Sequence, residues 1–209
     1  MAGMFVMAAM FAMFPSGAAA VAEPLLVAAP GKVTVEPTTT AEPRPVSPPA
    51  PAPTATPVMS ANAVEELKRR ALTLPVTGIT PDDLRDSFNE TRGASRRHEA
   101  LDVLAPRNTP VLAVEDGTIA RLFLSEAGGI TIYQFDPSSA YVYYYAHLER
   151  YAEGLKEGDS VKRGQVIGYV GTTGNAPRDT PHLHFAIFKL TDEKKWWQGT
   201  PIDPYSVLR

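Results

Sequence analysis

PHLHFAIFK, residues 181–189, begins with histidines that alternate with large apolar side chains, as in a half-buried β-strand. Side chains two residues apart on a strand point to the same face, so His182 and His184 would share one face. Leu183 and Phe185 would then point to the opposite, apolar face. Two neighbouring imidazoles can serve one site, one binding a metal ion and the other moving a proton, but an isolated pair is more often two surface histidines.

Several other short segments repeat this alternation, and glycines separate them. The segment PVLAVEDGTIARLFL, residues 110–124, contains Asp116-Gly117, a dipeptide that favours a two-residue hairpin turn. Many short strands at close spacing predict a mainly β, antiparallel sandwich or barrel-like domain over residues 75–209. The further strands are predicted over residues 130–135, 141–146, 166–170 and 183–189.

One helix is expected in front of this β domain. Ser60 is a candidate N-cap residue. Residues 61–72, ANAVEELKRRAL, combine strong helix formers with apolar side chains at helical spacing. We therefore predict a short amphipathic helix within residues 60–74.

The first 59 residues have a composition unlike that of a folded domain. Residues 1–22 are apolar and uncharged and end in Ala20-Val21-Ala22, which predicts a signal peptide cleaved after Ala22 or, if it is retained, an N-terminal membrane anchor. Residues 23–59 are rich in proline, which predicts a disordered linker in extended conformations.

The overall composition excludes several classes of protein. The chain has 209 residues, a net charge of −3 and 44% hydrophobic residues, which allows one well-buried domain and gives no charge excess that would indicate a nucleic-acid partner. The absence of cysteine excludes disulfides, thiolate nucleophiles and cysteine-based zinc sites. Any metal ion must therefore be held by histidine, aspartate or glutamate, and the sequence contains four histidines.

The other two histidines stand in separate segments. His98 and Asp102 form an H-x-x-x-D spacing in RRHEALDVLAP, which places both on one side of either a helix or a strand. A straight strand would hold them about 13 Å apart, so binding one ion together requires a bend between them, and a surface ion pair is the alternative. His147 ends the aromatic run YYYAHLER and, taken alone, fits a hydrogen-bonded structural residue better than a catalytic one.

Together, the motifs H-x-x-x-D, A-H-L and H-L-H occur in this order and use every histidine of the chain. This set closely resembles the lysostaphin/LytM-type zinc metalloendopeptidases of bacterial cell walls, whose signature is H-x-x-x-D, a Y-x-H-L block and H-x-H. The blocks PVLAVEDGTI, YAHLERY, GDSVKRGQVIGYVGTTGN and PHLHF also resemble that family. The resemblance covers about residues 75–205 and implies the family's fold, a LytM-type domain with the duplicated hybrid motif.

The resemblance also implies a catalytic zinc site. It implies His98, Asp102 and His184 as the ligands of one Zn²⁺ per chain, with one open position for water, as catalytic zinc sites have. It implies His147 and His182 as catalytic residues, one acting as general base and the other stabilising the oxyanion or protonating the leaving amine, and it leaves open which does which. The family usually has glycine where this chain has Ala100, so we expect the bend before Asp102 to use normally allowed backbone regions.

The reaction implied by the resemblance is hydrolysis of peptidoglycan stem peptides by a metal-bound water, without a covalent intermediate. Glycyl-glycine bridges and D-alanyl–diaminopimelate bonds are both substrates in such a family, and we predict the second. The chain would then be exported to the periplasm or cell envelope, attached to the inner membrane if the N-terminal segment is retained. The alternatives are a catalytically inactive LytM-type regulator that activates cell-wall amidases, a lipoyl- or biotinyl-type carrier, and a structural envelope protein.

Overall fold

The computed structural model describes residues 57–92 and 96–209, and the predicted histidine-bearing strand is present in it as β10 (His182–Leu190). Leu183 and Phe185 are fully buried on the apolar face of β10, as the alternation predicts. The expected signal peptide or anchor and nearly all of the expected linker lie outside the described residues. In the part of the chain that is described, no helix is both long and apolar enough to cross a bilayer.

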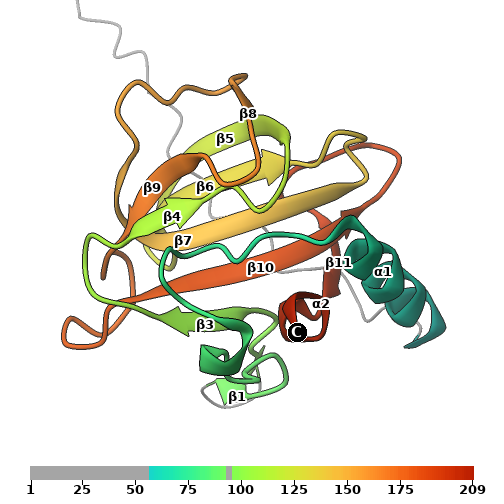
Figure 1. Ribbon diagram of the computed structural model, residues 1–209, viewed down its shortest axis with the longest axis horizontal. Helices are drawn as coiled ribbons and strands as arrows, with labels where there is room; N and C mark the ends of the chain where they lie inside the picture. The colour runs from blue at the N-terminus through green and yellow to red at the C-terminus, as the bar shows by residue number, and fades with distance from the viewer. Residues whose placement is uncertain (1–56, 93–95) are drawn as a thin grey trace, which may run out of the picture. The chain divides into compact units, whose positions relative to one another are not determined.

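β10 is hydrogen-bonded to other strands along both of its edges (Figure 1). One edge pairs with β7, and the other edge pairs first with β3 and then with β11. The first residues of β10 therefore lie between β3 and β7, and these residues include His182 and His184. The bounds of these neighbours are Tyr141–Tyr151 for β7, Leu101–Leu104 for β3 and Gly199–Ile202 for β11.

The sheet continues beyond β7 in the order β11-β10-β7-β6-β5-β8, and β9 pairs with both β7 and β4. Every pairing is antiparallel, which confirms the predicted fold class. Over the described residues the sheet does not close on itself, so the domain is not a barrel. The remaining strands are β4 (Pro110–Leu112), β5 (Gly117–Ser125), β6 (Gly129–Phe135), β8 (Ser160–Val161) and β9 (Val166–Val170).

The long strand β7 joins two parts of the domain, because its two ends pair with different strands. Its first residues pair with β10 and β6, whereas Leu148 and Tyr151 pair with β9 after a shift of register. Its tyrosines Tyr141, Tyr143 and Tyr145 are all buried at 1% exposure or less. Full burial of a large apolar side chain contributes about 1.5–3 kcal/mol, so this aromatic row anchors the core.

The prediction of a hairpin turn at Asp116-Gly117 is wrong. β4 pairs with β9, while β5 begins at Gly117 and pairs with β6 and β8, so the two strands do not pair with each other. Asp116 instead accepts hydrogen bonds of 2.9 Å from Lys162 Nζ and from the backbone N–H of Arg163. Gly117 is required by a close approach of two strands, because a Cβ at this position would lie 2.1 Å from the carbonyl oxygen of Phe135.

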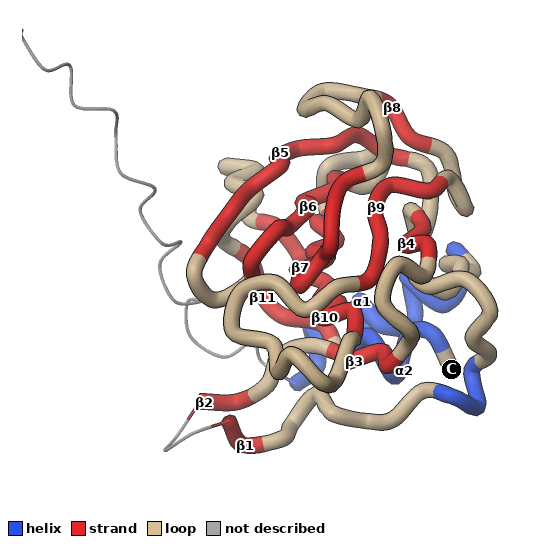
Figure 2. The backbone as a smooth tube through the Cα atoms, turned by 90° about the vertical axis from the view of Figure 1, so that its left-hand side faces the viewer, coloured by secondary structure: helices blue, strands red, loops and turns tan. Residues whose placement is uncertain are grey.

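The expected helix is present but begins earlier than predicted. α1 spans Pro57–Arg70, so Ser60 lies inside the helix and is not its N-cap. Ala63 and Leu67 are buried, and α1 contacts β11 and the C-terminal helix α2 (Pro204–Leu208). Between α1 and β3 the chain forms a short 3₁₀ turn, η1 (Pro81–Asp83), and a two-stranded ribbon of β1 (Thr91–Arg92) and β2 (Arg96–Arg97), which Figure 2 shows beside β3.

A partly buried network of charged groups fixes α1 to the sheet. Arg70 Nη1 donates to Glu115 at 3.2 Å and to Asp136 at 3.0 Å, and its Nη2 donates to Glu66 at 2.7 Å. The side chains of Glu115 and Asp136 are 7% and 0% exposed. Burial opposes the ionisation of Asp136, yet its hydrogen bonds, including the one from Arg70, hold its pKa below the usual value. Arg70 is thus the cation that two buried carboxylates share.

Replacing Arg70 with methionine is expected to lower the free energy of unfolding by about 3 kcal/mol, because it leaves Glu115 and Asp136 buried without their cation. Urea unfolding at neutral pH measures the change. Arg69→Met, on the exposed side of the same helix, is the matched control and should stay within about 0.5 kcal/mol of the wild type. If the two variants were equally stable, the network would not be what holds α1 in place.

Candidate active site

A bend of the chain brings His98 and Asp102 together, and neither a helix nor a straight strand is involved. β2 ends at Arg97, β3 begins at Leu101, and the chain bends at Ala100 between them. As a result His98 Nε2 lies 3.1 Å from Asp102 Oδ1. Ala100 is not among the residues with positive φ, so the bend uses normally allowed backbone regions, as expected.

His184 completes a compact cluster with these two residues. His184 and Asp102 are direct partners in the pairing of β10 with β3. The Nδ1 atom of His184 lies 3.0 Å from Asp102 Oδ1 and 3.1 Å from His98 Nε2. The three atoms form a triangle, and these three residues can hold a metal ion.

The donor chemistry of the triangle suits zinc. Three ligand atoms on a tetrahedral zinc ion lie about 3.3 Å from one another when each bond is about 2.0–2.1 Å long, close to the 3.0–3.1 Å sides found here. His98 Nδ1 lies 2.8 Å from the carbonyl oxygen of Ser87, so Nδ1 carries the proton and the lone pair of Nε2 faces the cluster. Converging acceptor atoms repel one another unless a cation or a proton lies between them.

The second carboxylate oxygen of Asp102 has a different partner. Arg92 Nη2 donates to Asp102 Oδ2 at 2.6 Å, while Oδ1 faces the two imidazoles. Burial raises the pKa of Asp102, but its close contacts with the imidazoles of His184 and His98 outweigh that effect and hold the pKa well below its usual range. Asp102 is therefore a carboxylate whose two oxygens are oriented separately.

His147 lies next to the cluster in a strained backbone conformation. Its φ is 60°, which is uncommon for a residue with a side chain, and it coincides with the register shift in β7. Its backbone N–H donates to the carbonyl of Gly128 and its Nδ1 donates to the carbonyl of Thr173, both at 2.8 Å. Burial and then the charge of His184 lower the pKa of His147 to about 4. At neutral pH the ring is uncharged and its Nε2 is a proton acceptor.

His182 is held in the same manner on β10. Its Nδ1 lies 2.9 Å from the carbonyl oxygen of Thr180, and its Nε2 lies 3.9 Å from Asp102 Oδ1. The ring centroids of His182 and His147 are 5.0 Å apart. Two imidazoles with a fixed tautomer therefore stand beside the cluster, each with one nitrogen available.

All five side chains singled out in the sequence, His98, Asp102, His147, His182 and His184, thus gather in one site. The groups that orient them were not predicted, because most are backbone carbonyls supplied by Ser87, Thr173 and Thr180. Arg92 was missed as well. Nothing in the segment ETRGASRRH distinguishes it from the two arginines that precede His98.

Comparison with known proteins places the chain in a family. The sequence pattern of Peptidase family M23 matches residues 96–204, about half of the chain and nearly all of the strands described above. The chain therefore belongs to peptidase family M23. The matched range contains every histidine and aspartate of the cluster and both neighbouring imidazoles.

Two curated relatives and one solved structure illustrate the likeness. An L-Ala–D-Glu endopeptidase of Bacillus subtilis (strain 168) is 34% identical over 151 residues, covering 69% of this chain and 44% of the relative. The peptidoglycan DD-endopeptidase ShyC of Vibrio cholerae is 34% identical over 114 residues, covering 51% of this chain and 25% of the relative. The catalytic domain of the antimicrobial peptidase lysostaphin from Staphylococcus simulans superposes with a TM-score of 0.52 at 28% identity, over 61% of this chain and 94% of that domain. This chain spans less than half the length of the two curated relatives.

Proposed function

We propose that this chain is a zinc-dependent endopeptidase that hydrolyses peptide cross-links of bacterial peptidoglycan. The observation that carries the proposal is the triangle of His98 Nε2, Asp102 Oδ1 and His184 Nδ1, with two further imidazoles beside it. Membership of family M23 supports the reaction class, and the names of the relatives support the substrate class.

The proposal gives each side chain of the site a role. His98, Asp102 and His184 hold one zinc ion, which supplies Lewis-acid activation of water and of the scissile carbonyl when it is bound. His147 and His182 are the catalytic proton carriers. Each has its Nδ1 fixed by a backbone carbonyl, so each Nε2 can accept a proton and later return it to the leaving amine. A protonated imidazole here also stabilises negative charge that develops on the carbonyl oxygen.

The bond that we propose is the D-alanyl–diaminopimelate cross-link. The Vibrio cholerae relative is named a DD-endopeptidase, which agrees with this choice, whereas the Bacillus subtilis relative is named for an L-Ala–D-Glu bond. Because relatives of equal identity are named for different bonds, product analysis is the decisive measurement.

Digestion of purified peptidoglycan, followed by mass spectrometry of the released fragments, tests the proposed function. We expect fragments with a new D-alanyl carboxyl group and a new amino group on diaminopimelate, and we expect none with His184→Ala. The complete set of five side chains speaks against the inactive regulator. Stimulation of a purified amidase by a chain that itself releases no peptide fragments would establish the regulator and overturn the enzyme.

We further propose that the chain acts in the cell envelope, because that is where its proposed substrate lies. Cell fractionation with N-terminal sequencing distinguishes a soluble exported form that begins at Glu23 from an intact form in the membrane fraction. A full-length chain found only in the soluble cytoplasmic fraction would contradict both.

A further inference from the structure

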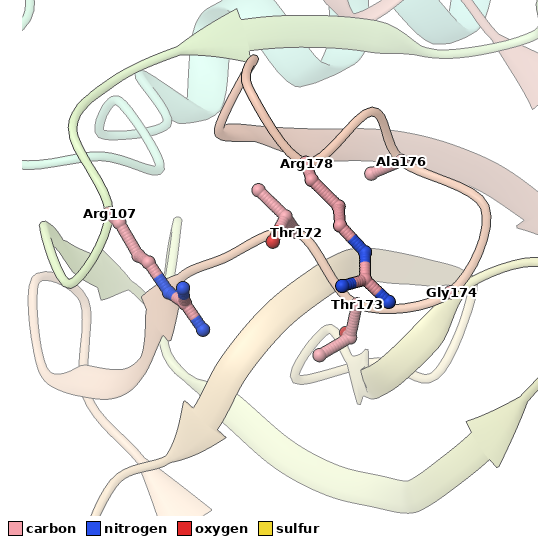
Figure 3. A pocket seen from close by; sticks show the side chains of 6 residues that line it. All are labelled: Arg107, Thr172, Thr173, Gly174, Ala176 and Arg178. Atoms are coloured by element: carbon pink, nitrogen blue, oxygen red, sulfur yellow. The ribbon is translucent and has the colours of Figure 1, made fainter.

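A pocket of about 400 Å³ opens beside the candidate active site, at the loop between β9 and β10 (Figure 3). Figure 3 shows Arg107 and Arg178 entering it from different segments, with Thr172 between them. Its lining is polar and cationic and consists of Arg107, Thr172, Thr173, Gly174, Ala176 and Arg178.

The pocket shares a wall with the site itself. Thr173 lines the pocket, and its carbonyl oxygen accepts the Nδ1 hydrogen bond that orients His147. The same loop orients His182 through the carbonyl of Thr180, and an isolated bridge pairs Gly171 with His182 at its base. A substrate bound across the two catalytic imidazoles therefore passes next to this pocket.

Two hydrogen bonds hold the Thr173 side chain, so the wall that it forms between the pocket and the site has a defined position. Its hydroxyl donates to the carbonyl of Leu148 at 2.7 Å and accepts the N–H of Ile130 at 3.0 Å. Gly174 packs against the turn that precedes β6, because a Cβ at this residue would lie 2.4 Å from the carbonyl oxygen of Ala127. The two threonines and two arginines thus line a built pocket at the end of β9.

The two arginines differ in what neutralises them. Arg107 makes two hydrogen bonds of 2.7 Å to the carboxylate of Glu149, one from Nε and one from Nη2. Among the described residues, neither the guanidinium of Arg178 nor the hydroxyl of Thr172 has a hydrogen-bond or ion-pair partner. The neighbouring Asp179 is exposed and accepts a hydrogen bond from the hydroxyl of Thr180. Glu149 therefore neutralises Arg107 but not Arg178, and the pocket has one uncompensated positive charge.

We propose that this pocket binds a free carboxylate of the peptidoglycan stem peptide, adjacent to the bond that is cleaved. Arg178 supplies the planar guanidinium fork, which matches a carboxylate with two parallel hydrogen bonds, and Thr172 supplies a hydroxyl donor. Stem peptides offer such groups on their D-glutamyl and diaminopimelyl residues. The inference rests on the proposed function and adds a determinant of which stem peptides are cleaved.

The test compares two synthetic cross-linked stem peptides that differ in one group, a free carboxylate or the corresponding carboxamide. Wild-type protein loaded with zinc is expected to cleave the carboxylate peptide with a kcat/KM about 10-fold higher than the carboxamide peptide. Arg178→Gln is expected to reduce kcat/KM for the carboxylate peptide to about the level of the carboxamide peptide, so that the preference between the two peptides is lost. Arg69→Gln, which removes the same charge from the exposed side of α1, should keep the preference.

Two other outcomes would contradict the proposal that this pocket binds a carboxylate, and they would leave the proposed function intact. One is equal cleavage of both peptides by the wild type, and the other is an equal loss on both peptides in Arg178→Gln. Arg178 is exposed, and its side chain has no hydrogen-bond or ion-pair partner in the described part of the chain, so its replacement does not threaten the fold. Unchanged zinc content confirms an intact site. Failure of the wild type to cleave either peptide or whole peptidoglycan would instead remove the proposed function itself.

Discussion

His184→Ala is expected to lose both the bound zinc and all peptide hydrolysis. His184 Nδ1 is one corner of the triangle, and it is placed by the register of β10 against β3, where His184 lies opposite Asp102. A catalytic zinc site uses three protein ligands, so two remaining ligands should not retain the ion at micromolar chelator concentrations. Metal analysis should find about one zinc per wild-type chain and almost none in the variant.

The matched control for this variant is His147→Ala, another histidine of the same site that does not belong to the triangle. It should bind as much zinc as the wild type. The His184 side chain is partly exposed, at 24%, so both metal-free proteins should still unfold in one cooperative transition. Equal zinc in wild type and His184→Ala would show that the ion is bound elsewhere.

The second large effect on activity is expected when either of the two imidazoles beside the triangle is removed. His147→Ala and His182→Ala should each retain zinc but lower the rate of hydrolysis by roughly 10²–10⁴, the usual contribution of one general acid–base group. The physical reason is that both rings present an Nε2 whose tautomer is fixed by a carbonyl, of Thr173 in one case and of Thr180 in the other.

Steady-state rates on purified stem peptides, with zinc content measured on the same samples, separate proton transfer from metal binding. Rates within a few-fold of the wild type for both variants would contradict the assigned roles. Loss of zinc from either variant would move that histidine into the group of ligands and require a new assignment of the site.

Local patterns were sufficient to predict much of the fold. The alternation in residues 181–189 predicted β10 correctly, because a strand with one buried face must place Leu183 and Phe185 in the core. The aromatic alternation around Tyr143 predicted β7 in the same way. In both segments the large buried side chains recur at every second residue, a spacing that a helix cannot satisfy.

Features that depend on distant parts of the chain could not be predicted in this manner. Asp116-Gly117 has the composition of a hairpin turn, but Gly117 is there because β6 approaches closely, and that contact joins residues far apart in sequence. The Arg70 network has the same origin, since Glu115 and Asp136 become partners of Arg70 only in the folded domain.

The candidate site, too, could be predicted from local sequence patterns only in part. The spacing of His98 and Asp102 left a helix, a strand and a bend open, and only the pairing of β3 with β10 determines that the chain bends. The convergence of both residues with His184 was implied by resemblance to a family and not by the spacing itself. Arg92 and the carbonyl groups that orient the imidazoles carry no local signal, because their role depends on position in space.

The proposed function depends on one metal ion held by His98, Asp102 and His184. The most direct measurement is titration of the metal-free protein with zinc while cleavage of purified peptidoglycan and the amount of bound ion are followed together. We expect no cleavage before zinc is added, and activity that rises with bound zinc and reaches its maximum at about one ion per chain. Full activity in the metal-free protein, or maximal zinc binding without any cleaved peptide bond, would contradict it.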